Sequence, residues 1–369
     1  MGRRGKDNKK KVVLLSVLVA ILVLIISATI VCLVVYNDFR NDVSGDDSLS
    51  EKKTIEIVSG DTTKRIASKL EAQGIVDYPF WFIVMARQQS VDNKLQIGTY
   101  EFTVGDSYQE ILDILKKAPN YRPALRIGFP EGTEVTDIIE KFLTEGKGKT
   151  SWTREGFEAA LIAEYDCAYI PSVNSLPEGV PVYARLEGFL YPDTYDFFLD
   201  STEEQLFAKM IDQFNKKVQS SDLVSKAQAA DMTVYDAMIL GSIIQKESGN
   251  VADFALISSV FNNRLDIDMK LQSDATVSYM IPKDERLASC TSAQLNTDTP
   301  YNVYMHKGLS PTPICCPRIE AIVAACEPEQ SDYYYFIGVP GNSPTPEAGK
   351  TLFSKTYQEH MQKVNKYLR

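Results

Sequence analysis

The stretch TVYDAMILGSIIQKESGN, residues 233–250, decides how the C-terminal half of the chain folds. Thr233 is a residue type that caps a helix N-terminus, and Gly249 stands where a helix ends in a left-handed residue. Apolar residues recur between them at the spacing of one helix face: Ala237, Leu240 and Ile244. The pattern predicts a helix over 233–248 that packs an apolar stripe into the core.

Glu247 continues this apolar stripe, whereas Lys246 lies on the wet face of the predicted helix. The free carbonyls of a helix C-terminus repel a carboxylate, and burial beside Ile243 and Ile244 disfavours its charged form. Both effects predict a pKa above the ordinary value of about 4.3. A carboxylic acid that stays protonated near neutral pH is what general acid catalysis requires. The alternative is a structural glutamate that turns outward to pair with Lys246 or Arg264.

The remaining composition narrows the chemistry to carboxylates. The chain has two histidines and six cysteines, without the spacing of a metal site or of a Ser-His-Asp or Cys-His arrangement, so neither a metal nor a cofactor is expected. Glycine-rich nucleotide motifs are also lacking in a suitable context. The sequence leaves open the pairing of five cysteines: Cys167, Cys290, Cys315, Cys316 and Cys326.

A second cluster, LEGFLYPDTYDF at residues 186–197, places aromatic rings beside carboxylates. Rings stack on the faces of sugars and acids hold their hydroxyls, so this composition is typical of a sugar-binding cleft. An ordinary aromatic-lined loop has the same composition, and that alternative stays open. The candidate binding residues here are Glu187, Tyr191, Asp193 and Tyr195.

A third cluster joins KLQSDATVSYM (270–280) to TPYNVYMHKGLSPTPI (299–314). Neutral amides and hydroxyls dominate both, which favours hydrogen bonding to an uncharged polar ligand. The proline-rich segment 308–313 is expected to hold a fixed shape. The candidate binding residues are Gln272, Thr276, Tyr301 and Asn302.

The N-terminus predicts a membrane anchor. Residues 12–36 are 25 residues without a charge, long enough at about 1.5 Å per residue to cross a hydrocarbon layer of about 30 Å. Residues 1–11 carry six positive charges and one negative charge, so this tail is expected in the cytoplasm and the rest of the chain outside. A cleaved signal peptide is the alternative, although its apolar core is normally shorter. The formal charge beyond residue 11 is −15, which argues against nucleic acid as a partner.

The organisation beyond the anchor predicts a mixed α/β (α+β) protein. Residues 37–52 are polar and resemble a linker. Residues 53–118 contain two strand-turn-helix units with a Gly-Asp step at each turn, a pattern that resembles the LysM module. The resemblance implies glycan binding by this small domain, and a purely structural role is the alternative. Residues 119–369 are expected to form a larger mixed α/β domain.

Taken in order, LEGFLYPDTYDF, SIIQKES, LQSDATVSY and the TPYN…GLSPTPI run resemble the YceG-like family of endolytic murein transglycosylases. The resemblance also covers the N-terminal anchor and the LysM-like region. It implies that Glu247 is the catalytic acid and that 119–369 is the catalytic domain. The sequence departs from the family pattern at Gln245, where a further glutamate is common.

The implied function is cleavage of the β-1,4 bond between N-acetylmuramic acid and N-acetylglucosamine in nascent peptidoglycan strands. It leaves 1,6-anhydro ends and stops strand elongation, at the cell membrane and beside peptidoglycan synthases or the division or elongation machinery. Two alternatives remain: a hydrolysing muramidase with a second carboxylate, and a membrane-anchored glycan binder or scaffold without activity.

Overall fold

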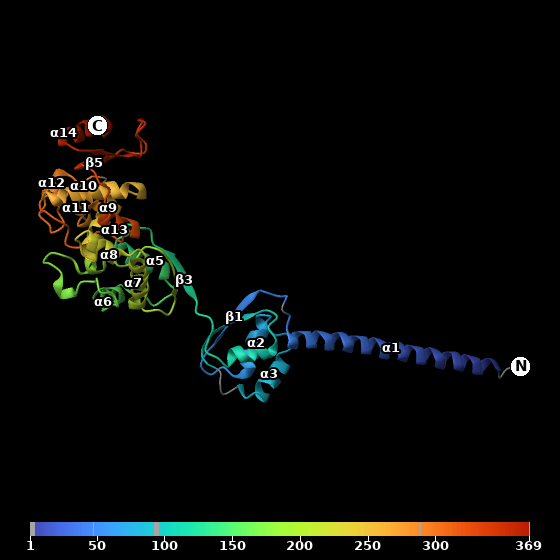
Figure 1. Ribbon diagram of the computed structural model, residues 1–369. Coiled ribbons are helices and arrows are strands. Elements are labelled where there is room, and N and C mark those ends of the chain that lie inside the picture. Colours follow the sequence, from blue (N-terminus) through green and yellow to red (C-terminus); the bar gives the residue numbers. More distant parts are fainter. Residues whose placement is uncertain (1–3, 47, 92–95, 288, 369) are drawn as a thin grey trace. The chain divides into compact units, whose positions relative to one another are not determined.

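The computed structural model describes residues 4–46, 48–91, 96–287 and 289–368, with side chains from Val17 onward. The chain forms two compact units, Met1–Pro123 and Ala124–Arg369, termed here unit 1 and unit 2 (Figure 1). Within the described residues, the strands pair into three two-stranded antiparallel sheets and helices make up most of the rest. The protein is therefore mixed α/β, mostly helical with small antiparallel sheets.

Helix α1 (Arg4–Ser44) contains the apolar segment of the N-terminus. Among the described residues, Val17–Ser44 is the helix long and apolar enough to cross a membrane, and both an anchor and a signal sequence have this character. The helix does not stop at Tyr36 but continues for eight residues into the segment expected to be a linker. Once nucleated, a helix gains one backbone hydrogen bond for each added residue, which favours this continuation.

The rest of unit 1 is a small α/β body. Its elements are β1 (Lys52–Ile57), α2 (Thr63–Ala72), α3 (Pro79–Gln88), β2 (Gly98–Thr103) and α4 (Tyr108–Leu115). β1 and β2 pair antiparallel, with Lys52 opposite Thr103. The turn glycines Gly60 and Gly105 have positive φ, and the side chains of Thr62 and Ser107 cap α2 and α4. Both predicted strand-turn-helix units are confirmed.

Unit 2 is larger and mostly helical. Its elements are β3 (Ala124–Gly128), α5 (Val135–Gly146), α6 (Arg154–Ile162), β4 (Thr194–Phe198), α7 (Glu203–Ser220), α8 (Leu223–Ala229), α9 (Val234–Glu247), α10 (Phe254–Asp266), α11 (Asp274–Tyr279), α12 (Ser292–Leu295), α13 (Ile319–Cys326), β5 (Tyr335–Gly338), β6 (Thr351–Ser354) and α14 (Tyr357–Tyr367). β3 pairs with β4 and β5 pairs with β6, both antiparallel. Helices α7 and α8 are separated at Asp222, whose φ of 54° is left-handed.

Helix α9 lies at the centre of unit 2, against α8, α10, α11 and α13 (Figure 1). The sequence predicts one buried face. In the structure nine of the eleven residues from Val234 to Ile244 are buried, so this part of the helix is enclosed on all sides. Thr233 caps it, with its hydroxyl accepting from the Asp236 amide. A core helix surrounded by partners leaves only its ends accessible, and the C-terminal end carries Glu247.

Candidate active site

Glu247 is the last residue of α9 and marks where this buried helix reaches a cleft. Ile243 and Ile244, in the turn before it, are fully buried, whereas Glu247 is half-buried. Ser248 leaves the helical conformation and takes an extended one, which ends the helix. The backbone of Glu247 is thus held by the buried helix, while its carboxyl group lines the cleft.

Loss of hydration raises the pKa of Glu247 above its ordinary value, and the negative charge of Asp274 raises it further. Two influences oppose this rise: the Ser273 hydroxyl donates a hydrogen bond to Oε1 at 2.5 Å, and Arg264 contributes positive charge. Burial is the largest of these effects, so the net direction is upward. The glutamate therefore holds its proton to a higher pH than a solvated one.

The two cations that a structural glutamate would use are engaged elsewhere. Lys246 contacts Glu134, with Nζ 3.3 Å from Oε1. Arg264 donates to the carbonyl oxygens of Tyr334 and Leu271, the former at 2.7 Å. Its guanidinium also lies 5.2 Å from the ring centre of Tyr335. These contacts favour a free carboxyl group over an ion pair at Glu247.

The cleft beside Glu247 has a volume of about 810 Å³. One wall is the loop that leads into α11, with Gln272 exposed and Asp274 behind it. Asp274 accepts a hydrogen bond from the Tyr304 hydroxyl at 2.6 Å and one from the Cys290 amide at 3.0 Å. Its carboxylate is fixed in place from both sides.

The C-terminal segment of the chain also contributes to the lining of the cleft. Tyr335 on β5 and Tyr357 and His360 on α14 line the cleft. The rings of Tyr335 and His360 stack, with centroids 5.2 Å apart and planes 29° apart. Sequence reasoning missed these residues, because nothing local in YYYFIGV or in the final helix connects them to a glutamate about ninety positions earlier.

Most of the aromatic cluster at 186–197 lies in the core. Glu187 is fully buried and accepts hydrogen bonds from the Val135 amide at 3.0 Å and the Tyr279 hydroxyl at 2.9 Å. Burial, followed by the negative charge of Glu134, raises the pKa of Glu187 to about 8. This glutamate joins the N-terminus of α5 to α11, and it does not line the cleft of Glu247.

The other predicted residues of this cluster also lie outside the cleft. Tyr191 and Tyr195 are buried, and the Tyr195 hydroxyl donates to the Tyr191 carbonyl at 2.6 Å. Asp193 is exposed and accepts a hydrogen bond from the side-chain amide of Gln213 at 3.0 Å. These contacts fix the entry into β4, and none of the three residues lines the cleft of Glu247.

Three residues of the third cluster do not line the cleft but hold the loops next to it. Thr276 is buried and donates at 2.9 Å to the carbonyl of Ser273, the residue whose hydroxyl contacts Glu247. The side-chain oxygen of Asn302 accepts from the Tyr304 amide at 3.0 Å. The Tyr301 hydroxyl is hydrogen-bonded to Thr312 at 2.7 Å. Of the residues predicted to bind substrate, Gln272 is the one that lines the cleft.

The described residues offer no metal centre, since they contain no group of three or more histidine, cysteine, aspartate or glutamate side chains placed to hold an ion. The cysteines are free thiols in this structure. Burial raises the pKa of Cys326 to about 11 and that of Cys316 further, so these thiols stay protonated. Within these residues the reactive group that the cleft presents is a carboxylic acid.

The chain is similar to known proteins over most of its length. The profile of the YceG-like family matches residues 55–366. A protein of Streptococcus pneumoniae serotype 2 named endolytic murein transglycosylase is 28% identical over 329 residues, which cover 85% of this chain and 58% of that protein. A Bacillus subtilis protein of the same name is 29% identical, over 85% of this chain and 84% of its own. The present chain thus spans little more than half the length of the streptococcal relative.

The crystal structure of a yceG-like protein, lmo1499 from Listeria monocytogenes, also resembles the chain. The TM-score is 0.52 and the sequence identity 29%, and the match covers 85% of this chain and 99% of the Listeria one. The similarity therefore extends over almost all of the Listeria protein.

Proposed function

Because the chain belongs to the YceG-like family, we propose that it is an endolytic murein transglycosylase with Glu247 as its catalytic acid. The observation that carries the proposal is that Glu247, with its raised pKa, lines a cleft together with Tyr304, Tyr335 and Tyr357. Relatives from Streptococcus and Bacillus carry this activity in their names. The substrate class is peptidoglycan, and the enzyme belongs with the carbon–oxygen lyases.

The proposed reaction uses one carboxyl group twice. Protonated Glu247 donates its proton to the oxygen that links C1 of N-acetylmuramic acid to C4 of N-acetylglucosamine, and the C1–O bond breaks. The neighbouring N-acetyl group of the substrate stabilises the positive carbon, so a protein nucleophile is not required. Glu247, now a carboxylate, takes the proton of the sugar's 6-hydroxyl as that oxygen bonds to C1. The products are a 1,6-anhydro end and a free 4-hydroxyl, and no water is consumed.

Other residues of the cleft position Glu247 and offer contacts to the substrate. Ser273 holds the carboxyl group of Glu247 through its hydroxyl. The exposed ring of Tyr357 offers a stacking surface for sugar rings, and Gln272 offers an amide for sugar hydroxyls. Thr276 and Asn302 do not line the cleft but hold the loops that carry Ser273 and Tyr304. We assign Tyr357 and Gln272 to substrate contact, and Thr276 and Asn302 to positioning.

The proposal includes a location. Helix α1 anchors the chain as a single span with its basic end in the cytoplasm, so that unit 2 meets glycan strands as they leave their synthases. Cleavage at that place ends strand elongation. Residues 53–118 remain a LysM-like glycan-binding candidate, and residues 119–369 the proposed catalytic domain.

Substitution of Glu247 by glutamine tests the assignment. Glutamine keeps the shape of the side chain but cannot donate a proton, and general acid catalysis typically contributes about 10²–10⁴-fold. Cleavage of uncross-linked glycan strands by the variant should fall by at least about 10²-fold, with unchanged circular dichroism and unchanged strand binding. Glu158→Gln, an exposed glutamate on α6, makes the same charge change and should cleave normally.

Mass spectrometry of the products separates the alternatives. New ends lighter by one water than hydrolytic ends identify a transglycosylase, whereas reducing ends that have gained water identify a muramidase. A Glu247→Gln variant with full activity would remove Glu247 from the role of acid. Binding without cleavage by the wild-type protein would favour the scaffold.

A further inference from the structure

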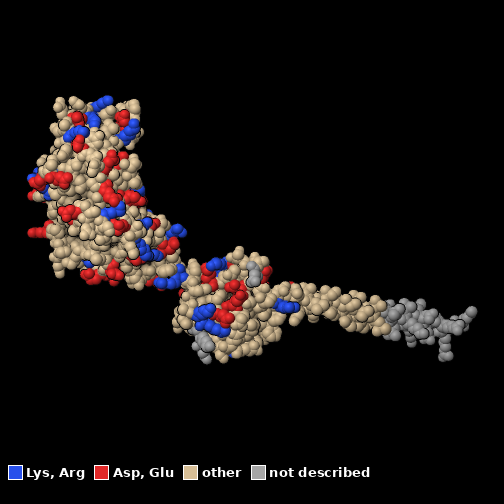
Figure 2. Space-filling view, viewed as in Figure 1, with Lys and Arg blue, Asp and Glu red and all other residues tan. Residues whose placement is uncertain are grey.

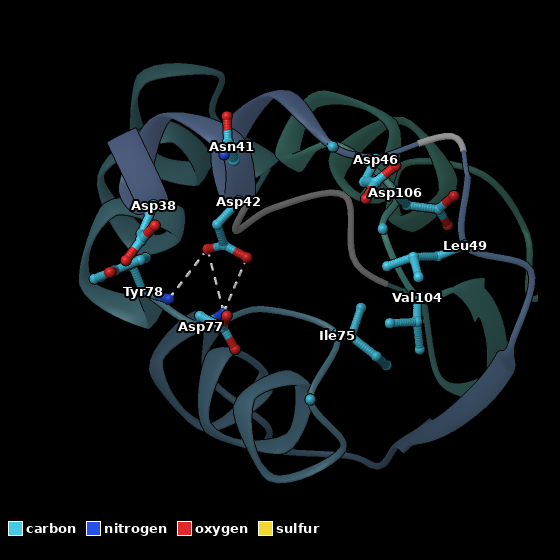
Figure 3. Close-up of a pocket in the computed structure, with 13 residues that line it drawn as sticks. Asp38, Asn41, Asp42, Asp46, Leu49, Ile75, Asp77, Tyr78, Val104 and Asp106 are labelled. Atoms are coloured by element: carbon cyan, nitrogen blue, oxygen red, sulfur yellow. Dashed lines mark hydrogen bonds between the residues drawn. The ribbon is translucent and has the colours of Figure 1, made fainter. Parts of the chain in front are cut away.

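The small α/β body of unit 1 is held directly against the end of α1. The carboxylate of Asp42, in the last two turns of α1, accepts hydrogen bonds from the amides of Asp77 and Tyr78 at 3.2 Å and from the Tyr108 hydroxyl (Figure 3). The Asp46 amide donates to the Gly105 carbonyl at 2.8 Å. The folded body therefore begins where the helix ends, and its position relative to the span is fixed.

Four aromatic side chains form a cluster where α1 meets the α/β body. The Phe39 ring of α1 contacts Tyr78 and Trp81, with centroids 5.7 and 5.4 Å apart, and Trp81 contacts Phe80 at 5.2 Å. Phe80 and Trp81 open helix α3 and are 66% and 46% exposed, whereas Phe82 beside them is buried. Helix α3 thus turns one aromatic face inward and leaves another outside.

The distance of this face from the apolar span is short. The uncharged run of α1 ends at Tyr36, and Phe39 lies three residues further, about 4.5 Å along the helix axis. Figure 2 shows that the described side chains of the span are uncharged until this end. The headgroup layer adds about 5–7 Å on each side of the hydrocarbon. Trp81, in contact with Phe39, therefore lies near the end of the uncharged run, where lipid headgroups are expected.

We infer that Phe80 and Trp81 dock unit 1 onto the outer surface of the bilayer, as a second membrane contact beside α1. Tryptophan favours this depth, because its ring is apolar and its N–H finds hydrogen-bond partners there. The inference rests on the proposed role of α1 as an anchor. The partner of this aromatic face is lipid, because the apolar helix α1 brings the bilayer next to it.

The charge near the junction decides which lipids are needed. The hollow beside α1 has a volume of about 390 Å³ and is lined by acidic residues: Asp38, Asp42, Asp46, Asp77 and Asp106 (Figure 3). Carboxylates are repelled by anionic headgroups, so electrostatic attraction does not drive the contact. Docking is therefore expected on zwitterionic membranes, and anionic lipid should weaken it in a way that salt reduces.

Fluorescence quenching in vesicles tests the inference. The chain has two tryptophans, Trp81 and Trp152, and Trp152 lies in unit 2. The full-length protein is reconstituted into phosphatidylcholine vesicles with bromine on the acyl carbons nearest the headgroup. Trp81 should lose at least roughly half of its emission there, since the ring lies at that depth. Trp81→Phe is the matched variant, and its remaining emission should not respond.

Each other result has a defined meaning. Quenching of Trp81 by aqueous acrylamide with no effect of brominated lipid would place the ring in water and overturn the inference. Protection from both quenchers would mean that protein covers the face, such as a second copy of the chain, and would overturn it as well. Failure of the protein to float with the vesicles would reject the anchor role of α1 itself, which is a separate outcome. Cleavage assays on soluble strands are independent of all three.

Discussion

Two neighbours of Glu247 shift its pKa in opposite directions. The Ser273 hydroxyl donates to the carboxylate and stabilises the charged form, which lowers the pKa, whereas the charge of Asp274 raises it. Burial exceeds both effects. The acid must be protonated to act, so activity should be present below the pKa of Glu247 and disappear as the pH rises through it.

Substitutions of these two neighbours should therefore shift the alkaline limb of the pH–activity profile, one to higher pH and the other to lower pH. Ser273→Ala removes the hydrogen bond, so the limb should move to higher pH, and Asp274→Asn removes the negative charge, so it should move to lower pH. A hydrogen bond to a charged group, worth about 1.5 kcal/mol, corresponds to a shift of about one unit. Profiles of kcat/KM measure both shifts, with Glu158→Gln as the unshifted control. Movement of both limbs in the same direction would contradict this account.

At the scale of elements, α9 and α13 pack so closely that the contact requires a glycine. A Cβ added to Gly241 would lie 2.8 Å from Cα and 3.0 Å from N of Ile322, and 3.1 Å from the carbonyl oxygen of Ala321. All three are backbone atoms, so no side-chain rotation relieves the overlap. The approach of these helices holds the C-terminal half of α9, and with it Glu247, in place.

Gly241→Ala should therefore destabilise unit 2 although alanine favours helices. The propensity gain is about 1 kcal/mol, whereas overpacking of a tight core costs about 1–3 kcal/mol. We expect a net loss of up to about 2 kcal/mol, seen as a fall in Tm of up to several degrees. Gly249→Ala is the control, because nothing lies within 4 Å of its added Cβ. Equal Tm values for the two variants would show that α13 can move away.

At the scale of the whole molecule, the candidate site belongs to one unit. The residues that line the cleft lie between Glu247 and Leu368, all within Ala124–Arg369. That unit contains two hydrophobic clusters made of its own residues, and unit 1 contains another. A unit that buries its own core has the physical basis for independent folding.

The fragment 124–369 should then fold alone and cleave soluble, uncross-linked strands at about the rate of the full chain. It lacks α1 and the Phe80–Trp81 face, so it should not bind vesicles. Thermal unfolding and product analysis measure the first expectation, and vesicle flotation the second. An unfolded fragment would show that unit 1 supplies stability, and a folded but inactive one would show that unit 1 takes part in substrate binding.

The sequence by itself determined the local features of this protein. The cap at Thr233, the apolar run after it and the Gly-Asp turns fix the elements, because capping and periodicity act between residues a few positions apart. The charge-free run before Tyr36 marks α1 for the same reason. The position of Glu247 at the end of a buried helix, and the direction of its pKa, follow from that local pattern.

Only the tertiary structure decided which side chains meet Glu247. Aromatic rings beside carboxylates have the same composition in a core as in a sugar cleft, so Glu187, Tyr191 and Tyr195 could not be assigned to the core from sequence. Tyr335 and His360 reach the cleft through packing across about ninety to one hundred and ten positions of chain. Contacts at that separation depend on how whole elements pack, and no local period encodes them.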